Sequence, residues 1–283
     1  MKTWILKVNN LTKRYGPGCS YCEAFHTPER SNRCPICGTI TANARISFTL
    51  EQGEVLGIVG ESGSGKSTLM QMVNLGLAAD DGEIWYREIG KHELPQEEPV
   101  NLLTLDKYAR RTFRNERLGI VYQRPELGLN MHFSVGGNVA EKLLLAGWRN
   151  VGQIRARTAE LMQLTELPSE RIDDSPQAFS GGMLQRVQIS KALSSNPAVL
   201  LLDEVTSGLD LSVQARVLDL IKRLQQERKM TMLLVSHDLG VIKQLASRTM
   251  VMKNGWVVES GLTDQILEDP QHPYTQLLVS STL

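Results

Sequence analysis

The segment Gly60-Glu61-Ser62-Gly63-Ser64-Gly65-Lys66-Ser67-Thr68 follows the apolar run Val55–Val59 and enters a stretch, residues 66–77, with the composition of a helix. The pattern G-x-x-x-x-G-K-S between a strand and a helix predicts a loop that binds phosphate groups. Its glycines let backbone N–H groups face phosphate oxygens, and the positive end of the helix adds to the attraction. We expect Lys66 to reach the outer phosphates and Ser67 to ligate Mg²⁺. An ordinary glycine-rich turn is the alternative, so further motifs must decide.

Two other apolar runs place polar residues where a nucleotide would bind. Asp203 and Glu204 follow Val199–Leu202, and His237 follows Thr231–Ser236. Such continuous runs are typical of strands covered on both faces of a parallel sheet, and ligands bind at the carboxyl ends of these strands. We expect Asp203 to hold Mg²⁺, Glu204 to act as general base for the attacking water, and His237 to contact the γ-phosphate. A solvated acidic turn and a surface or helix-capping histidine are the alternatives.

Several motifs occur in a characteristic order along the chain. Besides the phosphate loop and Leu200–Glu204, they are Gln123 in Val-Tyr-Gln-Arg, Phe179-Ser-Gly-Gly-Met-Leu-Gln-Arg186, Ser207-Gly-Leu-Asp210, and His237. Together they resemble the nucleotide-binding subunits of ATP-binding-cassette (ABC) proteins over almost the whole chain. The resemblance implies an ATPase with an α/β fold: a RecA-like parallel sheet core, an antiparallel edge sheet and a helical subdomain at residues 105–195. It implies one ABC nucleotide-binding domain over residues 1–283.

The resemblance also implies roles for individual residues. Gln123 would sense Mg²⁺ and the attacking water, and Tyr15 would stack on the adenine of ATP. The signature-like segment would clasp the γ-phosphate of ATP held by a facing subunit, through Ser180, Gly181, Gly182, Met183 and Gln185. Ser207 and Asp210 would lie at the dimer interface, in a homodimer or a dimer with a second ABC subunit. Met183 departs from the Gln found in many members and marks a subgroup.

The C-terminal part of the sequence narrows the choice of partner. Glu268–Leu278 resembles the tail of oligopeptide and dipeptide importer ATPases. The segments Val257–Asp264 and Gln276–Ser281, with Ser134–Asn138 and Arg171–Asp174, resemble the ABC subunit of the carbon–phosphorus lyase system for phosphonate breakdown. That resemblance implies docking on a soluble lyase core complex. The alternative is the ATPase of a peptide or other solute importer, which would bind membrane permease subunits.

The composition limits the other partners and the location. Lys plus Arg and Asp plus Glu both total 31, so no net positive charge attracts nucleic acid or an anionic membrane. No apolar run approaches the length of roughly 18 to 20 residues that a membrane span needs, and the first residues lack the pattern of a signal peptide. We therefore expect a cytoplasmic protein, which would be peripheral to the membrane if it served an importer.

Two features lie outside these motifs. Cys19-x₂-Cys22 and Cys34-x₂-Cys37, in an insert at residues 16–42, predict a Zn²⁺ site; an iron–sulfur cluster, disulfides or unpaired thiols are the alternatives. The insert is either an interaction module or a stapled loop beside the adenine edge. A basic stripe recurs at helical spacing and is either a solvated face or a docking surface for an acidic partner: Lys107, Arg110, Arg111, Arg114 and Arg117.

Overall fold

The computed structural model describes residues 3–88 and 98–281, apart from the side chains of residues 23–25. The chain divides into two compact units. Unit 1 consists of Met1–Leu105 and Leu233–Leu283, and unit 2 is Asp106–Met232. The sequence of residues 80–102, with Asp80-Asp-Gly82, Pro95 and Pro99, predicts a hairpin and a loop. Part of that segment, residues 89–97, lies outside the described residues.

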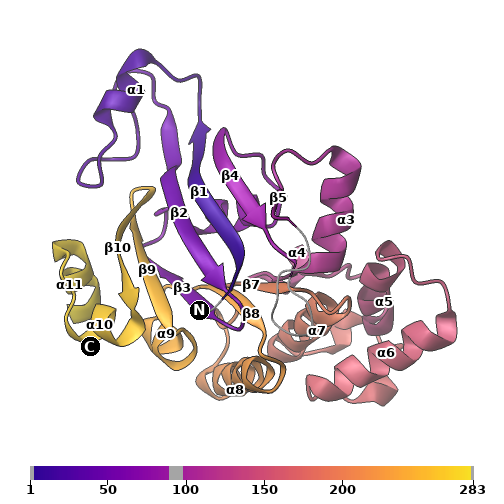
Figure 1. The fold of residues 1–283 in the computed structure, drawn as a ribbon. Coiled ribbons are helices and arrows are strands. Elements are labelled where there is room, and N and C mark those ends of the chain that lie inside the picture. The colour runs from indigo at the N-terminus through magenta and orange to yellow at the C-terminus, as the bar shows by residue number, and fades with distance from the viewer. Residues whose placement is uncertain (1–2, 89–97, 282–283) are drawn as a thin grey trace. The chain divides into compact units, whose positions relative to one another are not determined.

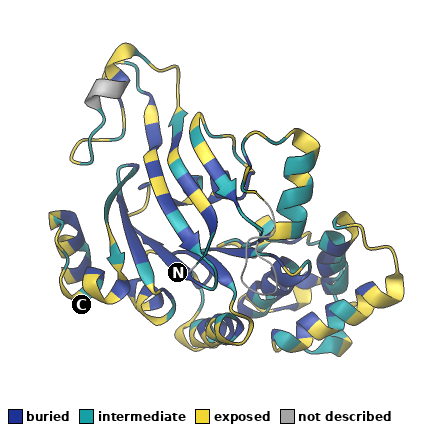
Figure 2. Cartoon of the chain, in the orientation of Figure 1, coloured by how far each residue is buried: buried dark blue, intermediate teal, exposed yellow. Residues whose placement is uncertain are grey.

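One sheet of unit 1 is antiparallel and has the order β2-β1-β4-β5 (Figure 1). Its strands are β1 (Trp4–Tyr15), β2 (Ile40–Glu51), β4 (Asp81–Tyr86) and β5 (Val100–Asn101). Burial alternates along β1, where Leu6 and Val8 are buried and Lys7 is exposed (Figure 2). One face of the strand therefore packs into the core while the other meets solvent. This sheet confirms the expected antiparallel edge sheet.

The second sheet of unit 1 carries the candidate phosphate site. Its strands have the order β10-β9-β3-β8 and are β3 (Val55–Val59), β8 (Thr231–Val235), β9 (Arg248–Lys253) and β10 (Trp256–Leu262); the division between the units falls within β8, after Met232. β3 runs parallel to β9 and is buried along its whole length, as its apolar sequence predicts. The helices of unit 1 are α1 (Ser20–Phe25), α2 (Lys66–Val73), α9 (Leu239–Leu245), α10 (Thr263–Glu268) and α11 (Pro273–Ser280).

The helix expected over residues 66–77 is shorter than predicted. α2 ends at Val73, and Leu75 has a φ of 57°, in the left-handed region. An L-residue in that conformation does not continue a right-handed helix. Residues 74–77, Asn-Leu-Gly-Leu, therefore belong to the turn after the helix.

Unit 2 combines two parallel strands with most of the helices. β6 (Leu118–Val121) pairs in parallel with β7 (Val199–Asp203). The α-helices are α3 (Lys107–Arg117), α4 (Pro125–Gly128), α5 (Val135–Leu145), α6 (Val151–Leu164), α7 (Gly181–Leu193) and α8 (Leu211–Arg228), with 3₁₀ turns at Ser169–Arg171 and Pro176–Ala178. Helices α3 to α7 fall within the segment expected as a helical subdomain, whose boundaries stay a prediction.

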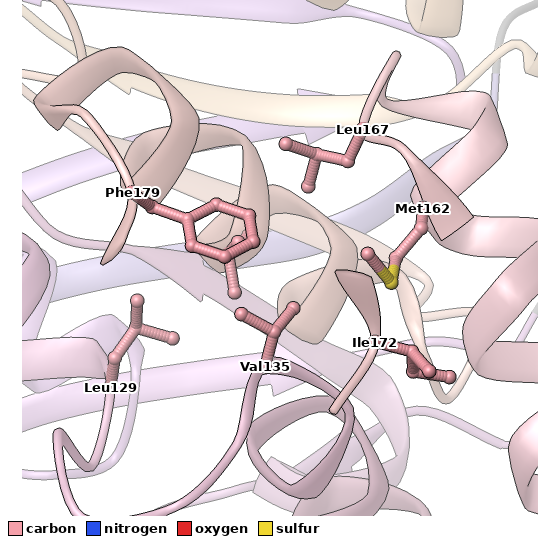
Figure 3. Packing of buried hydrophobic residues seen from close by; sticks show 7 residues of the cluster. Leu129, Val135, Met162, Leu167, Ile172 and Phe179 are labelled. Atoms are coloured by element: carbon pink, nitrogen blue, oxygen red, sulfur yellow. The ribbon is translucent and has the colours of Figure 1, made fainter. Parts of the chain in front are cut away.

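A cluster of buried apolar side chains holds the helices of unit 2 together. Phe179 lies in it, and the Arg171 guanidinium packs 4.1 Å from the centre of the Phe179 ring. Phe179 directly precedes the first residue of the signature-like turn, so the cluster fixes where α7 begins. Figure 3 shows the cluster from close by, formed by Leu129, Val135, Met162, Leu167, Ile172, Phe179 and Val187.

None of the helices within residues 3–88 and 98–281 has the length and apolar character required to cross a bilayer.

Candidate nucleotide site and cysteine cluster

The phosphate loop surrounds the side chain of Lys66. Lys66 is the first residue of α2 and only 5% exposed. Its ammonium donates hydrogen bonds to the carbonyl oxygens of Gly60 (2.6 Å) and Glu61 (2.9 Å). The cation is therefore held inside the loop, beside the N–H groups of the helix start, which are a favourable place for a phosphate. The other loop residues stay accessible to different extents: Glu61, Ser62, Gly63 and Ser67 are exposed, Thr68 is half-buried and Ser64 is buried.

The start of β2 supports the loop from one side. Gly65 has a φ of 103°, and a Cβ there would lie 2.0 Å from the carbonyl oxygen of Ala42. Nδ2 of Asn43 donates to the carbonyl oxygen of Gly65 at 3.3 Å. Only glycine fits this approach, so the motif's second glycine serves packing against β2 as well as phosphate binding.

Two segments from the C-terminal part of the chain support the loop as well. The N–H of Gly255, in the turn between β9 and β10, donates to the carbonyl oxygen of Ser64 at 3.0 Å. The hydroxyl of Tyr274, on α11, accepts the N–H of Glu61 at 3.0 Å. Burial raises the pKa of Tyr274, so the hydroxyl stays protonated. Neither residue was identified from the sequence as part of the site.

Two further candidates of unit 1 lie at strand ends. Tyr15 ends β1 and is 45% exposed, with the Lys13 ammonium 5.7 Å from the centre of its ring. An exposed aromatic face at a strand end can stack on an adenine. His237 is exposed and follows β8 after the buried Ser236.

In unit 2 the structure brings three predicted residues together. Oε2 of Glu204 accepts hydrogen bonds from Nε2 of Gln123 and Oγ of Ser207, both at 3.1 Å. Glu204 has a φ of 48°, in the left-handed region that costs a non-glycine residue roughly 1–2 kcal/mol. Strained backbone of this kind is common at functional sites, where it aims a side chain. Asp203 is the half-buried last residue of β7 and precedes it.

The signature-like turn begins α7. Ser180 is the N-cap, and its Oγ accepts the N–H of Met183 at 3.4 Å. Ser180 and Gly181 are exposed, whereas Gly182 is buried against α8, so a Cβ there would lie 2.1 Å from Cγ1 of Val213. The turn therefore presents a capped helix N-terminus on the surface of unit 2, which is a favourable place for a phosphate.

Asp210 forms the other end of the predicted dimer segment. It is the N-cap of α8, and its side chain accepts from the N–H of Val213 at 3.0 Å and from Oγ of Ser212 at 2.8 Å. The hydrogen bond from the Val213 N–H is the main reason that the pKa of Asp210 is lowered. The carboxylate therefore stays charged, and its hydrogen bonds to the first turn of α8 fix the position of Asp210 at the end of the segment that begins at Ser207.

Two buried glutamines on α7 hold the residue before Gln123. Gln185 is 2% exposed and donates to the carbonyl oxygen of Tyr122 at 3.1 Å. Gln188 donates to the same oxygen at 3.1 Å and accepts the Tyr122 N–H at 3.1 Å. Gln185 was expected in the signature set on resemblance alone, and Gln188 was missed. Both connect the signature helix to Gln123.

Comparison with known proteins identifies the family. The model of the family described as "ABC transporter" matches residues 44–207, more than half of the chain. The chain belongs to the ABC transporter family. It is 44% identical over 279 residues to the phosphonates utilization ATP-binding protein PhnK of Escherichia coli K12, covering 99% of this chain and 98% of that protein. It is 38% identical to the dipeptide transport ATP-binding protein DppD of Haemophilus influenzae, covering 84% and 70%.

Solved structures agree with this assignment. The dimeric ATP-binding cassette MJ0796, in a post-hydrolysis state with ADP and Pi, has a TM-score of 0.73 and 26% identity, covering 92% of this chain and 99% of that one. The cassette cbiO1 of Clostridium perfringens has a TM-score of 0.71. The predictions of an ABC-type α/β fold and of an ATPase are therefore confirmed: this chain is an ABC ATPase, the nucleotide-binding subunit of its assembly.

This ABC ATPase also brings its four cysteines together between β1 and β2, in a segment that we name the cysteine module (residues 16–39). Their Sγ atoms lie within 4.8 Å of one another, and the shortest separations are 3.6 Å (Cys19–Cys22), 3.7 Å (Cys19–Cys34) and 3.3 Å (Cys22–Cys37). None of the four forms a disulfide. Cys22 and Cys34 are buried, and Cys19 and Cys37 are half-buried.

The surroundings of the cysteines affect their ionisation. The hydroxyl and N–H of Thr39 lower the pKa of Cys37 to about 6. The N–H of Cys37 is the largest factor that lowers the pKa of Cys34, while burial raises the pKa of Cys22 to about 12. Two of the four sulfurs are thus stabilised as thiolates, the form that binds metal ions.

Proposed function

We propose that this ABC ATPase serves a carbon–phosphorus lyase complex in phosphonate catabolism. The observation that carries the proposal is the match to PhnK, which spans nearly both chains at 44% identity. The dipeptide and oligopeptide importer proteins DppD and OppD reach 38% and 37%, over 84% and 86% of this chain. The similarity to PhnK thus extends over segments that the importer proteins do not match.

Hydrolysis requires a base that takes a proton from water attacking the γ-phosphate. Glu204 has that role, and Gln123, hydrogen-bonded to it at 3.1 Å, orients the water. Lys66 and His237 stabilise the charge on the outer phosphates. The hydroxyl of Ser67, the carboxylate of Asp203 and the amide oxygen of Gln123 are hard donors that suit Mg²⁺, which neutralises phosphate charge when bound.

The active form is a head-to-tail dimer, either of two copies or with a second ABC subunit. Two arguments support this. The exposed helix start at Ser180 and Gly181 has N–H donors for a phosphate, and the solved cassette MJ0796 is dimeric. Met183 extends that contact, and Ser207 and Asp210 lie at the subunit interface. Gln185, expected in the same contact, is only 2% exposed and donates to the carbonyl oxygen of Tyr122, so it supports the turn from inside unit 2 instead.

The four cysteines bind Zn²⁺. A tetrahedral site with Zn–S bonds of about 2.3 Å requires sulfurs about 3.8 Å apart, and three pairs lie 3.3–3.7 Å apart. A cluster of several iron atoms must fit between its thiolates and needs wider spacing, so the geometry favours one ion. Metal analysis of protein purified under reducing conditions should find about one Zn²⁺ per chain. Less than a tenth of an equivalent of any metal would exclude the site.

Co-purification tests the phosphonate proposal. The chain should elute with a multi-subunit lyase core in the absence of detergent, and deletion of its gene should stop growth on a phosphonate while phosphonate uptake continues. The alternative is the ATPase of a peptide or other solute importer, since importer proteins are also relatives. Recovery only with membrane permease subunits, together with lost peptide uptake, would favour that alternative.

The basic stripe is the proposed docking face. It lies on α3, where none of the side chains is buried. Charge reversal should weaken binding to an acidic partner surface. Salt screens exposed ion pairs, so the difference in affinity between wild type and variant should be largest at low salt. The variant combines the substitutions Arg110→Glu, Arg111→Glu and Arg114→Glu. Unchanged co-elution of that variant at low salt would leave the stripe as a solvated face.

A further inference from the structure

The cysteine module contacts the turn between β9 and β10. Nδ2 of Asn254 donates to the carbonyl oxygens of Arg30 (3.0 Å) and Pro28 (3.4 Å), which follow the first cysteine pair. Asn254 has a φ of 48°, a conformation that asparagine tolerates better than most residues. One side chain thus ties the turn to two carbonyl groups of the module.

The same turn holds the phosphate loop. The N–H of Gly255 donates to the carbonyl oxygen of Ser64 at 3.0 Å, and its own carbonyl oxygen accepts the N–H of Ala44 at 2.8 Å. Asn254 and Gly255 are adjacent, so a shift of the module is transmitted to the N–H that donates to the loop through a single peptide unit. All of these residues belong to unit 1.

A second connection runs through β2. The N–H of Cys34 donates to the carbonyl oxygen of Thr39 at 2.8 Å, and the N–H of Thr41 donates to that of Asn32 at 2.8 Å, so the second cysteine pair continues directly into β2. The next residues of β2 are those against Gly65. The module therefore reaches the loop at Ser64 and at Gly65, by separate routes.

Few of the module's described side chains are buried. Cys22 and Cys34 are buried, but Tyr21 and Ile36 are exposed and α1 has only six residues. Segments below about 40 residues rarely fold without a metal or disulfides, because they cannot bury enough apolar surface to offset the lost chain entropy. Metal binding to such a segment is coupled to its folding.

We infer that the metal-filled cysteine module holds the phosphate loop in its binding conformation, so that metal occupancy of the four cysteines strengthens ATP binding, with Asn254 as the positioning residue. The inference rests on the proposed metal site. When the module loses its metal, the carbonyl acceptors at 28 and 30 become mobile, and ATP must then order both the turn and the loop. By linkage, ATP must strengthen metal binding by the same factor.

The test measures both sides of this linkage on the full chain. Calorimetry with Mg²⁺ and a non-hydrolysable ATP analogue should show about fivefold weaker binding for protein whose Cys34 and Cys37 are replaced by Ser, the effect expected for roughly one lost hydrogen bond. Competition for Zn²⁺ with a chelator should show about fivefold tighter metal binding in the presence of the analogue. Asn254→Gly keeps the left-handed backbone and should bind both ligands, but the mutual effect should fall clearly below fivefold, because only the route through β2 remains.

Matched variants separate the possible failures. Asn10 also has a φ of 48° and is exposed on β1, so Asn10→Gly should retain the linkage. Asn254→Asp, which removes the donor amide without adding glycine flexibility, should reduce the linkage as Asn254→Gly does. Protein that binds no metal would refute the proposed metal site. Protein that binds Zn²⁺ but has the same affinity for the analogue with and without it would overturn this inference while leaving the metal site standing. A linkage that stays at its full strength in both Asn254 variants would do the same.

Discussion

Glu204→Gln separates the chemical step from every other property of the site. The change is isosteric, and the amide oxygen can still accept from Gln123 and Ser207, which both bind Oε2 at 3.1 Å. We therefore expect the free energy of unfolding to change by no more than about 1 kcal/mol. ATP affinity should persist, because the groups that hold phosphate are in the phosphate loop.

The rate should fall much further than stability or affinity. An amide cannot take the proton from the attacking water, and general-base catalysis typically contributes about 10²- to 10⁴-fold. At about 1.4 kcal/mol for each factor of ten, the activation free energy should rise by roughly 3–5 kcal/mol. The variant should therefore accumulate the ATP-bound dimer.

The assay is steady-state phosphate release beside calorimetric ATP binding. Ser207→Ala is the matched control: it removes one donor to the carboxylate but keeps the base, so its rate should fall by about tenfold at most. A Glu204→Gln rate within tenfold of the wild type would show that the base lies elsewhere. Loss of ATP binding would show that Glu204 holds the nucleotide, contrary to the argument.

Four other substitutions have defined outcomes. Lys66→Ala should weaken ATP binding by at least about a hundredfold in calorimetry while the melting curve keeps its shape, because a phosphate cation is lost but little core volume; unchanged affinity would contradict the phosphate-loop assignment. Gly182→Ala should lower the melting temperature by several degrees, since its Cβ would lie 2.1 Å from Val213 and overpacking costs about 1–3 kcal/mol. Gly181→Ala, with no atom closer than 3.8 Å to its Cβ, should melt as the wild type does. Tyr274→Phe removes the acceptor of a phosphate-loop N–H and should cost about 1 kcal/mol in unfolding by denaturant; equal stability would mean that water replaces the hydroxyl.

Local sequence predicts the strands that are buried on both faces. β3, β7 and β8 appear as continuous apolar runs, and four residues of β7 and every residue of the other two are buried. β10 is different, because none of its residues is fully buried and its polar positions show no alternation. β10 is stabilised by its backbone pairing with β9, and the sequence of β10 alone does not identify that partner.

The same limit applies to the site. The phosphate-loop motif and the strand-end acids are local patterns, so Lys66 and Glu204 could be proposed from their place in the sequence. Tyr274 lies 213 residues from its partner Glu61, and Asn254 lies 224 residues from Arg30. An asparagine in a turn or a tyrosine on a short helix has many ordinary explanations, so only the fold distinguishes these residues from surface polar groups.

Within unit 2, hydrogen bonds from α7 connect the signature-like turn to Glu204, the proposed base. Gln185 and Gln188 both donate hydrogen bonds to the carbonyl oxygen of Tyr122, and Gln188 also accepts the Tyr122 N–H. The next residue is Gln123, whose side-chain amide donates to the carboxylate of Glu204. Both glutamines are buried, where a hydrogen bond cannot be exchanged for one to water without cost. A displacement of α7 must therefore carry the backbone at 122 with it and change the distance between Gln123 and the base. A phosphate that settles at the start of α7 then acts on the catalytic geometry through two side chains and one peptide bond.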